Sequence, residues 1–324
     1  MDNNFQQKQY VTTFIITGPI VHAESISSLT IIEQGLVAVV RGRIVQVNKN
    51  WEKLQKIQHI YGIDEENVYR LKKGEFLMPG FIDTHFHAPQ YPNVGLGYDK
   101  TLKQWLPEYT FPLENNFSDL DFASKVYESV VRRTLDNGTT TVSYFESIFY
   151  DSSLMLVDIV ERFGQRAFIG KVNMNVFNGT RYIEETYHSL QYTELFIKFM
   201  QNKQTILAHG VYLNNEDLKI LAEKKSSISH CPNSNTTLKS GLCDVRRLLN
   251  AGIKVGLGTA LSIEDKTGNF KVGKDFDAFI VNLNNPGPID LLEEITTKEM
   301  VEKFIFSGDD RNISKVFVAG RQVK

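Results

Sequence analysis

The chain has 324 residues, 42% of them hydrophobic and 23% charged, and 36 basic against 38 acidic side chains give a formal net charge of −2. This composition is typical of a soluble globular protein and excludes a disordered or collagen-like chain. The balanced charge argues against a nucleic-acid partner, and no apolar run reaches the ~18–20 residues that a membrane span needs.

Cysteine content and the N-terminus indicate the compartment. The two cysteines, Cys231 and Cys243, cannot form a disulfide framework. The first seven residues are polar and lack the apolar core of a signal peptide. We therefore expect a reducing, cytoplasmic location, and the length allows two domains or one large α/β domain with an appendage.

Both ends of the chain show the pattern of short β-strands. Residues 35–47 predict two strands around a turn at Gly42, and residues 277–282 and 315–323 show similar apolar runs. Because the ends of a domain often lie close together, we expect both ends to pair in one small β-rich domain, a β-sandwich.

Strands and helices alternate in the middle of the chain. The strand candidates are Gly80–His85, Thr139–Glu146, Arg166–Val172, Thr205–His209, Ser227–His230 and Ile253–Gly258. The helix candidates are an element from an N-cap at Ser118 to Gly138, one around Leu154–Phe163 that ends at Gly164, one that starts at Asn215, and Asp244–Asn250. Repeated β-then-α units imply a parallel sheet with right-handed crossovers.

Such a sheet can form either a doubly wound sheet or a TIM barrel. No glycine-rich phosphate-binding turn is present, which disfavours the first. Histidines follow several strand candidates, where barrel enzymes place their chemistry. We therefore predict an α/β protein with a barrel over residues 77–262 and a composite β domain of residues 1–76 and 263–324.

Histidine spacing points to a metal site. His85 and His87 end the first barrel strand, and side chains at i and i+2 of a strand face the same side, so both imidazoles can bind one metal ion. His209 and His230 end two later strands. Each is either a hydrogen-bonded histidine at a strand end or a group that orients a metal-bound water or contacts a substrate.

Other polar residues carry weaker signals. Gln90 follows the histidine pair, and its amide can both donate and accept, which suits a heterocycle with a carbonyl beside a ring N–H; a polar loop residue is the alternative. Cys231 has no base at a recognisable spacing, so we expect it to pack. His22, His59 and His188 have no partner spacing and are expected at the surface.

Several motifs resemble one known family. The stretch Pro79–His87 resembles the first-strand signature of the amidohydrolase superfamily, a group of metallo-dependent hydrolases. The narrower resemblance is to the guanine deaminase family. It rests on His85–Tyr91, Gln104–Pro112, Val131–Thr141, Phe163–Phe168, His230–Asn235 and Gly308–Ile313.

The resemblance implies hydrolysis of guanine to xanthine and ammonia in purine catabolism. It implies one Zn²⁺ per chain, with His85 and His87 as metal ligands, His87 and Gln90 as substrate contacts, and His209 as the catalytic histidine that orients the nucleophile. In the family, a histidine after strand five and an aspartate after strand eight complete the zinc site, and a glutamate shuttles the proton. Members of the family often form homodimers.

The chain departs from the family pattern in two places. The barrel stretch has about 180 residues, against ~250 in a typical barrel, and the strand after Arg166–Val172 matches the sixth of the family. Strands four and five, the third histidine and the glutamate are thus missing. Ala260 stands where the family has its metal-binding aspartate. Glu146, at a strand end, is the one carboxylate that the sequence offers in their place.

Three functional readings follow. The first is a zinc-dependent guanine deaminase on an incomplete barrel. The second is a catalytically inactive chain, which would be a shortened isoform, a gene-model fragment or an inert partner subunit, because a catalytic zinc site normally has three protein ligands. The third is another amidohydrolase, such as a chlorohydrolase-like or cytosine-deaminase-like enzyme. Gln90, Tyr91 and the loop around Trp105 favour guanine over the third.

Overall fold

The structure is a computed structural model that describes residues 11–25, 28–200, 206–208, 214–223, 227–230, 244–257 and 265–324. The chain divides into two compact units, which comprise 1–81 with 134–140 and 263–324, and 82–133 with 141–262. Within the described residues, no helix combines the length and apolar character that crossing a membrane requires.

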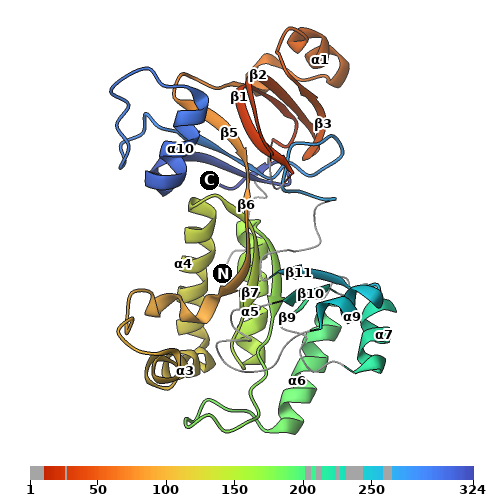
Figure 1. The fold of residues 1–324 in the computed structure, drawn as a ribbon, viewed down its shortest axis with the longest axis vertical. Helices are drawn as coiled ribbons and strands as arrows, with labels where there is room; N and C mark the ends of the chain where they lie inside the picture. Colours follow the sequence, from red (N-terminus) through yellow and green to blue (C-terminus); the bar gives the residue numbers. More distant parts are fainter. Residues whose placement is uncertain are drawn as a thin grey trace, which may run out of the picture. The chain divides into compact units, whose positions relative to one another are not determined.

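The first unit is built on one eight-stranded sheet to which both ends of the chain contribute (Figure 1). Its strands are β1 (Phe14–Ser25), β2 (Ser28–Val40), β3 (Arg43–Asn48), β4 (Val68–Arg70), β5 (Glu75–Pro79), β12 (Ala278–Asn282), β13 (Ile313–Val318) and β14 (Arg321–Gln322). The order is β14-β13-β12-β5-β1-β2-β3, with β4 also paired to β1. The central strand β5 joins the two ends, since Leu77 pairs with Ile280 of β12 and with Ile20 of β1.

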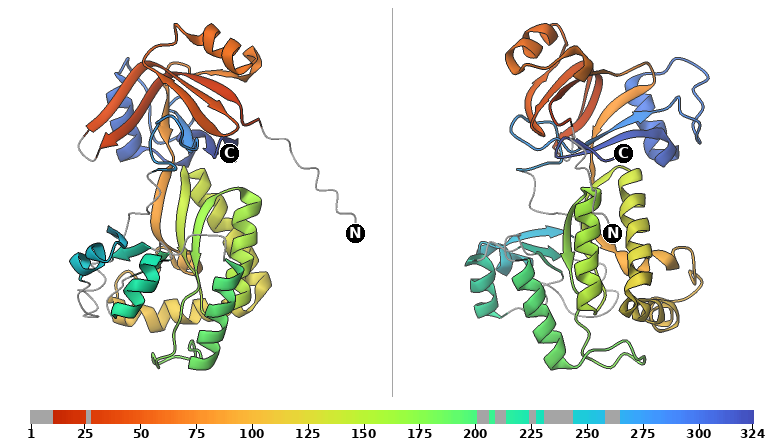
Figure 2. Two further views of the ribbon diagram at one scale, coloured as in Figure 1. Left: turned by 90° about the vertical axis from the view of Figure 1, so that its right-hand side faces the viewer. Right: turned by 180° about the vertical axis from the view of Figure 1, so that it is seen from behind.

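Strand alternation explains how this sheet is covered. Ile15 faces helix α1 (Leu54–Tyr61), while its neighbours Phe14 and Ile16 lie in a separate buried cluster with Phe276. A third cluster packs helix α10 (Thr297–Ser307) against β5 and β12. Figure 2 shows α1 and α10 beside the sheet from two further sides. Alternate residues of β1 thus serve different parts of the core.

The predicted turn at Gly42 is present and requires glycine. Gly42 has φ +80°, and a Cβ there would lie 2.1 Å from the carbonyl oxygen of Ala319. The turn therefore allows the backbone near the C-terminus to approach β2 and β3 closely. Two short helical turns, η1 (Glu65–Asn67) and η5 (Asp310–Asn312), complete this unit.

The second unit contains two three-stranded sheets. One orders β6 (Phe81–His87), β7 (Thr139–Phe145) and β8 (Arg166–Gly170), with helices α4 (Leu120–Asp136) and α5 (Tyr150–Phe163) in the connections. The other orders β11 (Lys254–Leu257), β10 (Ser227–His230) and β9 (Ile206–Ala208), with α7 (Asn215–Glu223) and α9 (Val245–Asn250). Strand pairs β7–β8, β9–β10 and β10–β11 are parallel. The predicted β-then-α alternation is confirmed, and all six strand candidates are strands.

Several helical elements of this unit were not predicted from the sequence. Helix α6 (Thr186–Phe199) follows β8. Between β6 and α4 the chain forms a run of short turns: η2 (Ala88–Asn93), α2 (Leu102–Trp105), η3 (Leu106–Thr110), α3 (Phe111–Asn115) and η4 (Asn116–Ser118). These turns lack the apolar periodicity of a long helix, so the sequence does not predict them.

The N-cap predicted for α4 is wrong by one residue. Asp119 caps the helix, because its Oδ1 accepts hydrogen bonds from the backbone N–H groups of Asp121 (2.9 Å) and Phe122 (3.2 Å). Ser118 instead closes the preceding turn, since its hydroxyl donates to the carbonyl of Asn115 at 3.1 Å. Both residue types cap helices well, so composition alone does not distinguish them.

The assignment of Asp119 rather than Ser118 as the N-cap of α4 can be tested by mutation. Replacement of Asp119 by Ala is expected to lower the free energy of unfolding by ~1 kcal/mol, the usual cost of losing an N-cap. Ser118→Ala is the matched control and is expected to change it by less than about 0.5 kcal/mol. Urea unfolding of both variants measures the difference. Equal effects of the two substitutions would contradict the assignment.

One of the three histidines expected at the surface is buried. His22 is 5% exposed and its ring lies 5.7 Å from that of Phe270, so the prediction for His22 is wrong. Burial lowers its pKa below the usual histidine value. His59 and His188 are exposed as expected. His22 lies in β1, most of whose residues are buried, so its place in the sheet buries the side chain although it is polar.

Candidate active site

His85 and His87 converge at the end of β6. Their Nε2 atoms lie 3.1 Å apart and both side chains are half-buried. Phe86 points to the other side, where its ring meets the edge of Tyr144 at 5.7 Å. The alternation of side chains along a strand produces this arrangement. The prediction that both imidazoles face one point is confirmed.

The aromatic ring of Phe145 forms one wall of this pair. Its centroid lies 4.2 Å from the ring of His85 and 5.2 Å from the ring of His87. Phe145 ends β7, the strand next to β6. The ring restricts the rotation of both imidazoles and lowers the local polarity around them.

The spacing of the two nitrogen atoms fits a shared metal ion. Two histidines bound to one tetrahedral Zn²⁺ at ~2.0–2.1 Å place their nitrogens roughly 3.3 Å apart, and the observed separation of 3.1 Å is close to this. Within the described part of the chain, no group of three or more His, Cys, Asp or Glu side chains could hold a metal ion. The described residues therefore fit zinc at two ligand positions and supply no third.

Of the two later histidines, the structure describes only the backbone of His230. His209 and Ala260 lie outside the described residues, as does Cys231. The backbone of His230 ends β10, as predicted. Their expected contributions to the site stay predictions.

Gln90 lies in the turn η2 and contacts a buried carboxylate. Its Nε2 donates to Oε1 of Glu114 at 2.8 Å, and Glu114 is only 4% exposed. Tyr182 is a second hydrogen-bond partner of this carboxylate, and its own oxygen accepts from the backbone N–H of Ile148 at 2.9 Å. Burial raises the pKa of Glu114 to about 7, against the opposing effect of these hydrogen bonds.

The raised pKa predicts a pH-dependent stability. Because the folded state binds the Glu114 proton more tightly than the unfolded chain does, the associated stability is present below about pH 4.5 and is lost as the pH rises through 7. Glu114→Gln removes this titration. The variant is expected to gain about 3 kcal/mol of unfolding free energy relative to wild type between pH 4.5 and pH 8.5. Urea unfolding across this range measures the gain, and a flat difference would contradict the prediction.

Glu146 is fully buried beside the start of α5 rather than beside the histidines. Its Oε2 accepts from the backbone N–H and hydroxyl of Ser147 at 2.7 and 2.9 Å and from the hydroxyl of Ser152 at 3.2 Å. Burial raises its pKa. Phe145, which contacts the histidines, is the last residue of β7, and the hydrogen-bond partners of Glu146 lie in the segment that leads into α5. Among the described residues, Glu146 therefore does not replace a missing metal ligand.

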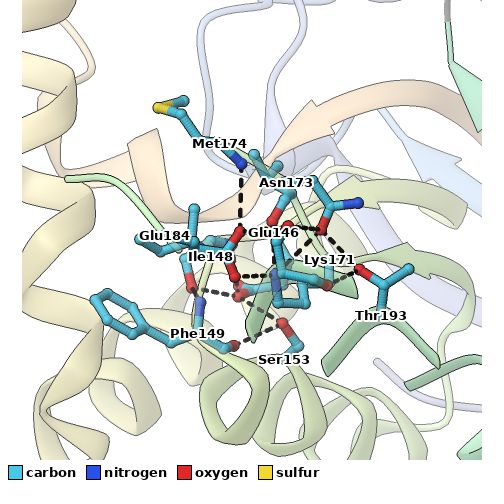
Figure 3. A network of polar contacts seen from close by, with 12 residues as sticks. Glu146, Ile148, Phe149, Ser153, Lys171, Asn173, Met174, Glu184 and Thr193 are labelled. Atoms are coloured by element: carbon cyan, nitrogen blue, oxygen red, sulfur yellow. Dashed lines mark hydrogen bonds and ion pairs between the residues drawn. The ribbon is translucent and has the colours of Figure 1, made fainter. Parts of the chain in front are cut away.

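A buried ion pair follows β8. Lys171 Nζ lies 2.6 Å from Oε1 of Glu184, and the two side chains are 1% and 7% exposed. Lys171 Nζ also donates to Oδ1 of Asn173 at 3.2 Å. The same oxygen accepts a hydrogen bond from the hydroxyl of Thr193 in α6. Figure 3 shows these side chains together. Burial lowers the pKa of Lys171, and the charge of Glu184 opposes this. The pair ties the segment that carries Tyr182 to the end of the sheet.

Sequence reasoning missed Phe145, Glu114 and the Lys171–Glu184 pair. Phe145 had one usable signal, its position at the end of the strand next to the histidine strand. Glu114 follows the apolar run Phe111–Leu113, and a carboxylate there is a candidate for burial. The ion pair has no local pattern, because its partners are 13 residues apart on different segments.

Comparisons with known proteins identify the family of the chain. The Amidohydrolase family matches residues 76–203, 180–261 and 259–323. The chain is 32% identical to a probable guanine deaminase of Schizosaccharomyces pombe, over 96% of this chain and 84% of that protein. It is also 32% identical to guanine deaminase of Rattus norvegicus, over 95% of this chain and 96% of that protein.

Solved structures give the same result. Guanine deaminase from C. acetobutylicum, with guanine bound in its active site, superposes with a TM-score of 0.70 and 26% identity, over 96% of this chain and 100% of that one. An E. coli guanine deaminase shares the fold with a TM-score of 0.70 at 21% identity. The α/β fold is therefore that of the amidohydrolases.

The alignments also contain long gaps. The two comparisons with S. pombe and Rattus norvegicus run over 441 and 438 positions, although this chain has 324 residues. The family matches as three successive segments, which overlap at residues 180–203 and 259–261. The sequence predicts that strands four and five and the metal-binding aspartate are missing near these residues. The chain belongs to the Amidohydrolase family and, within it, to the guanine deaminase family.

Proposed function

We propose that this chain binds guanine and removes its 2-amino group by hydrolysis, which yields xanthine and ammonia. The observation that carries the proposal is the convergence of His85 and His87, with Nε2 atoms 3.1 Å apart at the end of β6. Gln90, three residues further, supplies an amide for a purine. The C. acetobutylicum relative with bound guanine supports a small-molecule substrate of this kind.

Zinc is the proposed cofactor, and His85 and His87 are the residues that would hold it. When bound, zinc supplies the Lewis acidity that makes water a nucleophile near neutral pH. Phe145 keeps the two imidazoles in place, and Gln90 and His87 are the proposed substrate contacts. His209 is the proposed group that orients the attacking water.

The finer architecture belongs to the same proposal. The barrel over 77–262 is incomplete, and residues 1–76 and 263–324 form a composite β-sandwich domain. The parallel strand pairs β7–β8, β9–β10 and β10–β11 support the first statement, and the one eight-stranded sheet shared by both chain ends supports the composite domain. A homodimer in the cytoplasm is the proposed state of the protein, by resemblance to the family.

The test measures zinc and turnover in one sample. Purified chain is analysed for zinc by mass spectrometry, and guanine loss and xanthine formation are followed by absorbance. About one zinc per chain with xanthine formation supports the proposal. Folded protein without zinc and without turnover contradicts it.

A second function is favoured by a separate observation. Ala260 stands where the family has its metal-binding aspartate, and the described residues offer no third ligand beside the two histidines. On this basis the alternative is a catalytically inactive member of the family. Retained guanine binding with a zinc content well below one per chain and no xanthine would identify it.

A further inference from the structure

The hydrogen bond between Gln90 and Glu114 has a defined donor and a defined acceptor. A carboxylate accepts hydrogen bonds, so the 2.8 Å contact requires the NH₂ group of Gln90 to face Glu114. The Oε1 atom of the same amide then points elsewhere, and among the described residues it has no hydrogen-bond partner. Gln90 is half-buried, and Oε1 is the atom of its amide that is left for a ligand.

Glu114 is itself held in place from a second side. The Tyr182 oxygen accepts the backbone N–H of Ile148 at 2.9 Å, which leaves the hydroxyl hydrogen for the carboxylate of Glu114. Glu114 thus accepts from two donors on different segments, η2 and the loop before α6. A buried group with two fixed partners has one orientation.

We propose that Glu114, held by Tyr182, fixes the side-chain amide of Gln90 so that its Oε1 accepts a hydrogen bond from a ring N–H of the purine. Glu114 is then a positioning residue that makes the site selective for rings with an N–H donor at that edge. This inference rests on the proposed function, because it takes Gln90 as a purine contact.

The orientation is expected to depend on pH. The groups that face Glu114 are Gln90, Tyr182 and Glu146, and the Glu146 charge adds to the effect of burial. With a pKa of about 7, Glu114 is ionised and acceptor-only in mildly basic solution. Once protonated, it can donate to the Gln90 oxygen, and the amide can turn over. Selectivity for the N–H donor should therefore be stronger at pH 8.5 than at pH 6.

The test compares guanine with 1-methylguanine and 9-methylguanine, each of which lacks one ring N–H. Dissociation constants, or KM and kcat where the ligand is turned over, are measured at both pH values. For the wild-type chain, one of the two methylated purines is expected to bind about 10–100-fold more weakly than guanine at pH 8.5, because the acceptor loses its donor.

Two variants and one control assign this effect. Glu114→Gln can donate to Gln90 as well as accept from it, so the penalty against the methylated purine is expected to fall below ~5-fold and to lose its pH dependence. Tyr182→Phe removes the hydroxyl that holds Glu114 and is also expected to lower the penalty against the methylated purine. This second variant keeps the test possible if Glu114→Gln does not fold. The exposed Glu185→Gln is expected to keep the wild-type ratio.

Each outcome decides the proposal. An unchanged penalty in Glu114→Gln overturns it even if guanine binds normally. If the wild-type chain binds no purine, the proposed function fails, and the side-chain amide resonances of ¹⁵N-glutamine decide the positioning role. The Gln90 amide, assigned by Gln90→Glu, is then expected to shift with a midpoint near pH 7 in wild type and not in Glu114→Gln. No shift in wild type overturns the inference.

Discussion

A chain with both His85 and His87 replaced by Asn is expected to lose stoichiometric zinc and guanine turnover while remaining folded. The two imidazoles are the convergent nitrogen donors at the end of β6, with Nε2 atoms 3.1 Å apart. Changing residues that only support a zinc ligand costs 10–100-fold in affinity, so losing two ligands is expected to cost well over ~100-fold. Zinc content by mass spectrometry and xanthine formation measure the two losses.

The matched control is His59→Asn, the same chemical change at an exposed histidine. This variant is expected to keep the wild-type zinc content and rate. A melting curve for each variant separates loss of zinc from loss of fold. About one zinc per chain in the double variant would place the metal on other residues and contradict the site assignment.

The second large effect is expected from the buried ion pair. Glu184→Gln leaves the Lys171 ammonium, 1% exposed, without its charge partner. Removing one partner of a buried pair usually costs ~3–5 kcal/mol, because the remaining charge stays desolvated. We therefore expect the free energy of unfolding to fall by about that amount. The segment that carries Tyr182 is expected to unfold at a lower urea concentration than in the wild-type chain.

Two comparisons show whether the charge is the cause. The double variant Lys171→Met with Glu184→Leu buries no charge and is expected to recover most of the lost stability. Glu185→Gln, at the exposed neighbouring position, is expected to change it by less than about 0.5 kcal/mol. Urea unfolding measures all three. Equal destabilisation by the single and double variants would show that packing, rather than the unpaired ammonium, accounts for the loss.

Much of the secondary structure follows from local patterns. The strand candidates before His85, before Phe145 and at residues 166–172 are strands, since apolar runs bounded by turn residues and histidines carry a strong local signal. Helix α6 was missed because its apolar positions do not keep one face, and six of its residues, including Tyr187, Leu190 and Ile197, are large and exposed apolar side chains. Its packing depends on neighbours that no local pattern contains.

The candidate site was likewise predicted only in part from the sequence. The i, i+2 spacing of His85 and His87 predicts a shared direction, because alternation is a property of any strand. Glu146 shows the limit of this rule. A strand end was enough to name it as a candidate, but the face on which it lies depends on register, and a shift of one residue turns a side chain to the other side.

The sequence alone determined the family, the β-then-α order and the shared direction of the two histidines, and it predicts that the blocks with the third histidine and the aspartate are missing. All of these are local motifs or counts along the chain. Tertiary structure decided that Phe145 lines the histidine pair, that Glu114 orients Gln90, and that Glu184 neutralises Lys171. These contacts join segments far apart in the chain or on different strands, and burial, which sets their charge states, exists only once the chain has folded.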